Sequence, residues 1–307
     1  MSSPKAPISK QLLVVGGATA SGKTSLAIAL AGRLNTEIIS ADSRQFYKEL
    51  NIGVARPSAE ELALVPHHFI SSRSITEPYS AGKYALDALA KIDELFAKAD
   101  HVVLVGGSGL FIEAVTHGFH EQEAKDSTNI RKELQDLHQE EGIEALQNIL
   151  KGMDPSHYKM LDTKNPHRLM RAIERVRVTG KTHLEQVEPP LVNRPFKTNY
   201  VAIEWPRADL YDRINQRVDV MMKKGLLDEV KSVYAHRDQN ALKTVGYKEL
   251  FDYMDGIYTL PEAIDKIKQN TRRYAKRQLT WFKNKTTARW YNPHTAADEI
   301  VADLSRW

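Results

Sequence analysis

One octet, Gly17–Thr24, constrains this chain more than any other stretch, because it fits the pattern G-x-x-x-x-G-K-[ST]. The apolar run Leu12–Val15 before it is typical of a strand, and the residues from Lys23 onward repeat at helical spacing. Between a strand and a helix, such glycines let backbone N–H groups surround phosphate oxygens, and the threonine hydroxyl can hold Mg²⁺. An ordinary glycine-rich turn is the alternative. The predicted phosphate- or diphosphate-binding loop consists of Gly17, Ala18, Thr19, Ala20, Ser21, Gly22, Lys23 and Thr24.

Strand-like and helix-like segments alternate through the first part of the chain. Glu37–Ser40 and His101–Val105 have the pattern of short buried strands, and Tyr79–Ala99 that of a helix. This alternation predicts an α/β fold, a P-loop NTPase-like parallel sheet with helices on both faces. Ligands of such sheets bind beyond the carboxyl ends of the strands. We therefore expect Asp42 and Ser108, which follow strand ends, to share one pocket with the loop.

Between residues 120 and 166 the sequence becomes polar, charged and helical, with breaks at Asp154-Pro155 and Asn165-Pro166. We predict a helical subdomain over 120–166, inserted into a P-loop core formed by 1–119 and 167–307. Its expected helices are Asn129–Gln139 and Ile143–Lys151. The core is expected to resume with helices His167–Thr179, Ala208–His236, Val245–Met254 and Pro261–Lys283 and the strand Tyr200–Trp205.

Composition narrows the function further. The chain of 307 residues has no cysteine, so disulfides and cysteine-based zinc sites are excluded. The start of the chain is polar and no apolar stretch approaches membrane-spanning length, so we expect a cytoplasmic protein. The net charge is only +4, but nine Lys or Arg and no acid lie between Lys266 and Ala297. Such asymmetry favours an anionic polymer as partner.

Two charged residues are candidates for chemistry at the loop. Asp42 opens the segment DSRQFY, which is either a simple turn or a carboxylate placed to accept a proton or touch magnesium. On the expected helix Ala208–His236, Arg213 has Asp209 one turn earlier as a natural partner. Arg217 has no acid three or four residues away on either side. Arg217 is therefore either solvated or a clamp for a diphosphate.

The segment Thr271–Lys283 is strongly basic. It fits a solvated amphipathic helix, but its cations interleaved with Tyr274 and Trp281 also suit phosphate contacts with base stacking. The strand His101–Val105 ends in glycines, where nucleotide-hydrolysing P-loop proteins normally place an acid for magnesium. The usual ATPase apparatus is thus incomplete, while a small-molecule kinase remains possible.

Taken together and in order, the motifs resemble the tRNA dimethylallyltransferases, also called tRNA isopentenyltransferases, nearly from end to end. Each motif is weak alone, but the ordered set is very specific. The motifs are GATASGKT at Gly17–Thr24, DSRQFY at Asp42–Tyr47, NIGVARP at Asn51–Pro57, HHFI at His67–Ile70, GGSGLF at Gly106–Phe111, HRLMRAIE at His167–Glu174, VGYKE at Val245–Glu249 and AKRQLTWF at Ala275–Phe282. The absence of cysteine excludes the zinc finger of eukaryotic relatives and makes the chain similar to bacterial members.

The resemblance implies an activity. Dimethylallyl diphosphate would donate its prenyl group to N6 of adenine 37 in tRNAs reading codons that begin with U, with Mg²⁺ assisting and pyrophosphate leaving. Asp42 would be the general base, Thr19 would lie near the reacting centre, and Arg217 would help to neutralise the leaving group. Thr24 would hold the magnesium ion. The helical insertion would clasp the anticodon stem, and the protein would act as a monomer.

The resemblance also implies a tRNA-binding surface. The matching positions are Asp42, Ser43, Arg44, Gln45, Ser108, Arg131, His167, Arg168, Leu169, Met170, Arg171, Lys243, Thr244, Val245, Gly246, Tyr247, Lys248, Lys276, Arg277, Gln278, Leu279, Thr280, Trp281, Phe282 and Lys283. Relatives usually carry Pro at Ala18, Thr at Ser108 and Tyr at Phe111, and often Asp at Ser71. None of these departures removes a reacting group.

Three other functions compete with this one. A nucleotide or small-molecule kinase would share the P-loop but leave DSRQFY and AKRQLTWF unexplained. A non-catalytic RNA-binding protein would use the basic helix but leave Asp42 and the loop idle. Prenylation of a free adenine nucleotide is the closest rival, and the insertion and the basic C-terminal helix disfavour it.

Overall fold

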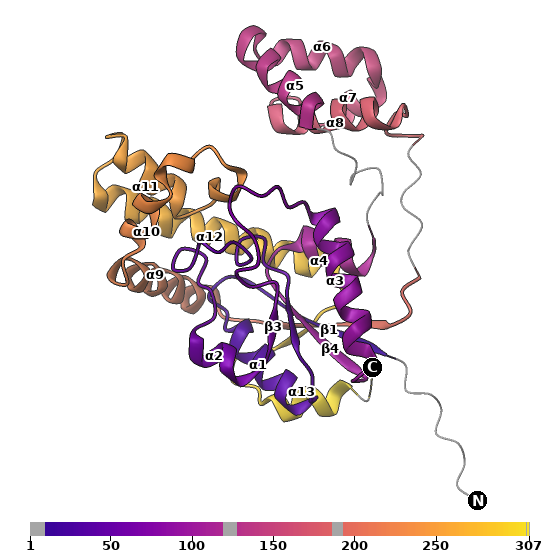
Figure 1. Cartoon of the computed structure of the whole chain (residues 1–307), viewed down its shortest axis with the longest axis vertical. Helices are drawn as coiled ribbons and strands as arrows, with labels where there is room; N and C mark the ends of the chain where they lie inside the picture. Colours follow the sequence, from indigo (N-terminus) through magenta and orange to yellow (C-terminus); the bar gives the residue numbers. More distant parts are fainter. Residues whose placement is uncertain (1–9, 119–127, 186–192, 305, 307) are drawn as a thin grey trace, which may run out of the picture. The chain divides into compact units, whose positions relative to one another are not determined.

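The computed structural model describes residues 10–118, 128–185, 193–304 and 306. The chain forms two compact units: unit 1 comprises Met1–Thr116 and Arg194–Trp307, and unit 2 comprises His117–Asn193. Figure 1 shows both, with the strands in unit 1 and a bundle of helices in unit 2. Among the described residues, no helix is both long and apolar enough to cross a bilayer.

Unit 1 contains a sheet of six parallel strands, which confirms the predicted α/β fold. The P-loop strand β1 lies between β4 and β5, and β2 pairs on the other side of β4. The strands, in their order across the sheet, are β3 (His67–His68), β2 (Ile38–Ser40), β4 (His101–Val105), β1 (Gln11–Gly16), β5 (Lys197–Ile203) and β6 (Arg289–Tyr291). We did not predict β3 or β6.

Helices cover both faces of the sheet (Figure 1). Leu13 and Val15, two residues apart, share one buried cluster with α1 (Lys23–Arg33) and with α13 (Ala297–Leu304). The alternate residue Val14 is equally buried and faces the other side. There α3 (Ala81–Phe96) contacts β4 and packs on α4 (Gly109–Thr116). The short helix α2 (Ala59–Leu64) contacts α1.

The C-terminal helices of unit 1 depart from the prediction in one place. The expected single helix Ala208–His236 is broken, because Gly225 has a φ of 95°, a left-handed conformation that a continuous α-helix does not contain. Its two parts are α9 (Arg207–Lys223) and α10 (Leu226–Ser232), followed by the short 3₁₀ turns η2 (Tyr234–His236) and η3 (Asn240–Leu242). The other two helices are confirmed as α11 (Tyr247–Met254) and α12 (Leu260–Lys285).

Unit 2 is a helical bundle, and it is larger than the predicted insertion 120–166. Its helices are α5 (Thr128–Glu141), α6 (Ile143–Met153), α7 (Pro155–Met160) and α8 (Pro166–Thr179). We had placed α8 in the core, but its buried Leu169 and Ile173 pack with Leu134 and Leu146 of the bundle. The apolar face of α8 therefore belongs to unit 2. The expected boundary at residue 120 lies outside the described residues.

Candidate active site

The loop Gly17–Thr24 joins β1 to α1, as predicted, and lies against two C-terminal helices. Ala18 is completely buried among Leu210 and Ile214 of α9 and Ala275 of α12. Gly22 caps α1 with a φ of 92°, a conformation open to glycine. The hydroxyl oxygen of Ser21 is buried and has no hydrogen-bond partner among the described residues. Such a buried hydroxyl is available to a phosphate oxygen.

The carboxyl ends of β1, β2 and β4 meet beside this loop. The Ala41 N–H donates to the Val105 carbonyl (2.7 Å), and the Gly106 N–H donates to the Val15 carbonyl (3.2 Å). A Cβ on Gly106 would lie 2.4 Å from the Ala41 carbonyl oxygen, so only glycine fits this junction. Farther along both loops, the Ser43 N–H donates to the hydroxyl of Ser108 (3.1 Å). The segments that follow β2 and β4 are thus joined, as predicted.

Three charged side chains influence one another at these strand ends. Burial lowers the pKa of Lys23 to about 8, the positive charge of Arg217 lowers it as well, and Asp42 opposes both effects. Burial also lowers the pKa of Arg217, again against the charge of Asp42. The arrangement places two cations and one carboxylate at the predicted phosphate loop. Arg217 is half-buried there, and its role as a diphosphate clamp stays a prediction. The cations are suited to an anion that carries more than one charge.

Asp42 forms a turn and also lies close to the charged residues at the loop. Its carboxylate accepts a hydrogen bond from the Arg44 N–H (2.9 Å), which is the turn interaction. Burial and then the charge of Asp42 raise the pKa of Tyr274, while Ser108 and Arg44 lower it. Tyr274 therefore lies near the carboxylate. We had assigned Tyr274 to packing or base stacking and missed its place at the site.

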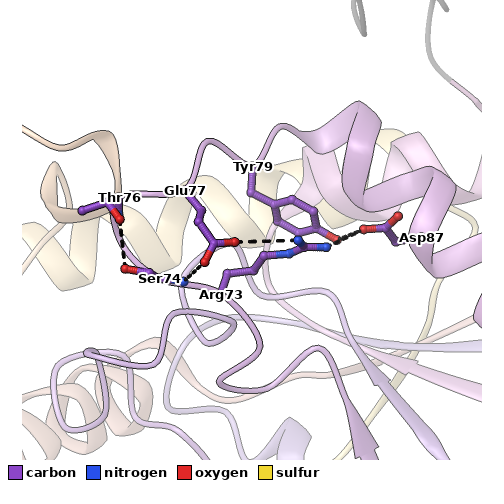
Figure 2. Close-up of polar contacts among 6 residues, drawn as sticks. All are labelled: Arg73, Ser74, Thr76, Glu77, Tyr79 and Asp87. Atoms are coloured by element: carbon purple, nitrogen blue, oxygen red, sulfur yellow. Dashed lines mark hydrogen bonds and ion pairs between the residues drawn. The ribbon is translucent and has the colours of Figure 1, made fainter.

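The segment after Asp42 is held by a second network. The Arg73 N–H donates to the Phe46 carbonyl (2.9 Å), and the Lys48 N–H donates to the Arg73 carbonyl (2.8 Å). Figure 2 shows the Arg73 guanidinium between Glu77 and Asp87, with the Tyr79 hydroxyl donating to Asp87. These bonds fix the strand-like pairing beside DSRQFY and anchor it to α3.

Two loop contacts differ from the prediction. Arg213 forms no ion pair with Asp209 among the described contacts; its Nε donates to the Ala20 carbonyl (2.9 Å). The Thr19 N–H, which we expected to face a phosphate, donates to Oε1 of Gln278 (2.8 Å). Because an amide N–H makes one strong hydrogen bond, Thr19 does not offer this group to a ligand in the present conformation.

Several residues assigned to tRNA contact have side chains that are buried in this structure. Tyr247 and Leu169 are completely buried, and Phe282 is buried against Gly16. Gln278 is 5% exposed, and its amide also donates to the Gly107 carbonyl (2.9 Å). Met170 is buried in the core of unit 2. In this conformation these five side chains pack the elements that carry the surface, and their assignment to tRNA contact stays a prediction.

The remaining predicted residues differ in exposure, and several of the exposed cations also contact other side chains. Arg131 forms a bidentate contact with Glu174, at 2.7 and 3.0 Å, and Lys283 contacts Glu204 at 3.0 Å. Arg277 lies over the ring of Tyr274 at 5.7 Å. The exposed residues of the predicted surface are Arg131, His167, Arg168, Arg171, Lys243, Lys248, Lys276, Arg277, Thr280 and Lys283. The partly buried ones are Asp42, Ser43, Arg44, Gln45, Ser108, Thr244, Val245, Leu279 and Trp281, while Gly246 is buried.

The protein oxygen atoms near the loop suit a magnesium ion that is bound mainly by the phosphate oxygens of a substrate. Within the described residues, no group of three or more His, Asp or Glu side chains is arranged to hold a metal by itself. Thr24 in the first turn of α1 and the nearby Asp42 supply oxygen atoms. Mg²⁺ typically keeps several waters and uses one or two protein oxygens together with substrate phosphates. These residues therefore fit a Mg²⁺–diphosphate complex.

A glycine-rich loop between β1 and α1 of a parallel sheet, with two cations and a carboxylate beside it, is the arrangement expected of an α/β protein that binds a phosphate ligand. The family model for IPP transferase matches residues 45–285. The chain belongs to the IPP transferase family.

Similar proteins agree with this membership. A tRNA dimethylallyltransferase from Flavobacterium johnsoniae is 46% identical over 95% of this chain and 96% of its own. One from Christiangramia forsetii is 47% identical, with 92% and 94% covered. The crystal structure of a tRNA isopentenylpyrophosphate transferase from Bacillus halodurans is 37% identical, with a TM-score of 0.70 over 97% and 95% of the chains. A eukaryotic dimethylallyltransferase acting on tRNA, 24% identical, shares the fold with a TM-score of 0.81 over 97% and 79%.

Proposed function

We propose that this protein transfers the dimethylallyl group of dimethylallyl diphosphate to tRNA and releases pyrophosphate. The relatives named above carry this activity in their names and match nearly the whole chain. The observation that supports the chemistry here is the assembly of Lys23, Arg217 and Asp42 at the phosphate loop. A kinase also uses cations and a base, so the distinction from a kinase comes from the relatives that match nearly the whole chain.

The loop would bind the diphosphate of the donor. The α1 N-terminus offers N–H groups without helical partners, and the buried Ser21 hydroxyl offers a further donor. Lys23 and Arg217 would neutralise the charge that develops as the C1–O bond breaks. When Mg²⁺ is bound through Thr24 and the diphosphate oxygens, it supplies additional positive charge for the leaving group.

Asp42 would act on the acceptor. A bond forms between N6 of the target adenine and C1 of the prenyl group, and the carboxylate takes the proton that N6 loses. The adenine amine is a poor nucleophile, so proton removal and positioning both contribute to the rate. Thr19, in the loop, would lie near the reacting carbon. The acceptor would be adenine 37 of tRNAs that read codons beginning with U, and it would leave its stack at a cost of roughly a few kcal/mol.

The exposed cations of both units would bind the RNA. Lys276 and Arg277 lie on the outer side of α12, whose inner residue Gln278 contacts the phosphate loop. In unit 2, Arg168 and Arg171 are exposed on α8 and would contact the anticodon stem. We propose that the enzyme works in the cytoplasm as a monomer.

Mass spectrometry of tRNA nucleosides tests this function. Purified protein is incubated with tRNA, dimethylallyl diphosphate and MgCl₂, and the tRNA is then digested. We expect a dimethylallyl adenosine that requires all components, located at position 37 by fragmentation of the anticodon-loop oligonucleotide. Phosphorylation of a metabolite with ATP, without any prenylated nucleoside, would instead show the kinase. Binding of tRNA with no product would show a non-catalytic RNA-binding protein.

A further inference from the structure

Three side chains from outside the phosphate loop form hydrogen bonds with its backbone. Each of them bonds to a different one of three consecutive loop residues. Oε1 of Gln278 accepts from the Thr19 N–H (2.8 Å). Nε of Arg213 donates to the Ala20 carbonyl (2.9 Å). Nε1 of Trp205 donates to the Ser21 carbonyl (2.9 Å). We call Gln278, Arg213 and Trp205 the loop brace.

The loop needs an external brace because its backbone is strained. Ala20 has a φ of 62°, in the left-handed region that a residue with a Cβ rarely occupies. Such a conformation is unfavourable for a residue with a side chain and persists only when surrounding contacts impose it. The Ala20 carbonyl is held by Arg213 on one side, and the Ala20 side chain packs on the cluster formed by α9 and α12.

The members of the brace are themselves fixed. The Arg213 guanidinium lies 4.3 Å from the ring centroid of Trp205, so the two donors are stacked together. The Gln278 amide is buried and donates to the Gly107 carbonyl, which connects the loop after β1 with the loop after β4. A Cβ on Gly107 would lie 2.1 Å from Nε2 of Gln278. Only glycine at position 107 therefore leaves room for the side-chain amide of Gln278.

The brace sets the direction of the loop amides. In a trans peptide the carbonyl of one residue and the N–H of the next point in opposite directions, and the described residues contain no cis peptide bond. Because the Ser21 carbonyl points outward to Trp205, the Gly22 N–H points back into the loop. The Ser21 N–H already donates to the Ala18 carbonyl within the loop (3.3 Å).

We propose that Gln278, Arg213 and Trp205 are positioning residues of the donor site, which hold the loop in the conformation that binds diphosphate. This inference rests on the proposed function, because it assigns the loop to the prenyl diphosphate. It also gives Gln278, which the family motif associates with RNA contact, a role on the donor side. Loss of a brace contact should therefore weaken diphosphate binding and leave tRNA binding unchanged.

The test uses inorganic pyrophosphate with MgCl₂ as probe, measured by calorimetry. The variants are Arg213→Gln, Trp205→Phe and Gln278→Met, and Arg207→Gln on α9 is the matched control, because Arg207 stacks on Tyr211 and not on the loop. Each brace variant removes the hydrogen bond between that side chain and the loop, so that one backbone group of the loop loses its partner. We expect the Kd for pyrophosphate to rise about five- to tenfold in each brace variant. The control should match the wild type, and tRNA affinity should stay within about twofold in all four.

Two results would overturn the brace. One is a pyrophosphate affinity equal to that of the control in folded variants. The other is a parallel loss of pyrophosphate and tRNA binding with a lowered Tm, which would show general destabilisation; Trp205→Phe, which keeps an aromatic ring under Arg213, guards against misfolding as the cause. Failure of the proposed function is distinguishable, since a wild type that binds pyrophosphate but does not prenylate tRNA would leave the brace intact.

Discussion

At the scale of single residues, Asp42 combines an observed structural contact with a proposed catalytic role. Its carboxylate receives the Arg44 N–H, which stabilises the turn after β2, and it also affects the pKa values of Lys23 and Arg217. An oxygen that accepts a backbone hydrogen bond is held in place, and a base benefits from being held. The turn and the proposed catalytic role are therefore compatible.

Replacing Asp42 with Asn keeps this turn and removes the proton acceptor. Because the amide oxygen can still accept from Arg44, folding and tRNA affinity should change little. The rate of prenyl transfer should fall by roughly two to four orders of magnitude. Single-turnover kinetics with saturating donor measure this step. Near-normal turnover of D42N would remove Asp42 as the base.

Lys23 predicts a pH dependence of donor binding. Its pKa in the free protein is lowered to about 8, so the side chain loses its charge as the pH rises through that value. A bound anion favours the charged form, and the affinity for pyrophosphate should therefore decline between about pH 7.5 and 9. Lys23→Arg stays charged over this range and should show a shallower decline in calorimetric titrations. Equal slopes for both proteins would contradict this explanation.

Arg217→Ala tests the leaving-group side of the site. Its loss removes one of the two cations near the loop while leaving the RNA surface intact. We expect a higher KM for dimethylallyl diphosphate or slower release of pyrophosphate, with unchanged tRNA binding. Steady-state kinetics with varied donor and a separate tRNA titration distinguish these effects. A defect confined to tRNA binding would show that the assignment is wrong.

At the scale of elements, α12 has two chemically different sides. Its inner side carries Gln278 against the phosphate loop and Phe282 against Gly16. Its outer side carries the exposed Lys276 and Arg277. The helix therefore packs against the phosphate loop with one side and exposes positive charge, which we propose binds RNA, on the other.

Replacing Lys276 and Arg277 together with Gln should weaken tRNA binding and flatten its dependence on salt, because fewer phosphates are neutralised. Pyrophosphate binding should be spared, since Gln278 remains. Fluorescent tRNA is titrated at several ionic strengths, with circular dichroism to check folding. Unchanged affinity and slope would mean that these side chains only solvate the helix.

The elements also show which local signals carry enough information. The loop after β1 could be predicted because its glycines, Lys23 and Thr24 match a known phosphate-binding pattern. The helix α12 could be predicted because its apolar spacing and its Thr259–Glu262 capping box agree. The break at Gly225 was missed, since an isolated glycine within a periodic pattern does not by itself end a helix. The brace was not predictable, because Gln278 and Thr19 are 259 residues apart and only the fold brings them together.

At the scale of the whole molecule, the chain forms two units with separate cores, and we propose that they have different tasks. Unit 1 contains the phosphate loop, Asp42 and α12. Unit 2 contains the basic helix α8, which we had assigned to the P-loop core. The apolar stripe with Leu169 and Ile173 predicts a buried helix face, but the sequence does not show which neighbours that face packs against. A change on the surface of unit 2 should thus leave the donor loop unaffected.

Arg168→Glu tests this division of work. Arg168 is exposed and contacts only Asp162 among the ion pairs of the described residues, at 3.6 Å. A reversed charge there should reduce tRNA affinity several-fold at low salt, while the Kd for pyrophosphate stays at the wild-type value. Calorimetry and tRNA titration on the same preparation measure both. Unaltered tRNA affinity would remove this part of α8 from the RNA surface.

The most direct test of the central proposal is the stoichiometry of the reaction. The wild-type protein receives dimethylallyl diphosphate and MgCl₂ with tRNA in one reaction, with free adenosine monophosphate in another, and with no acceptor in a third. We predict that pyrophosphate is released only in the presence of tRNA, and that each pyrophosphate is matched by one dimethylallyl adenosine in the digested tRNA. Pyrophosphate release without tRNA prenylation, or prenylation of the free nucleotide in place of tRNA, would contradict the proposal.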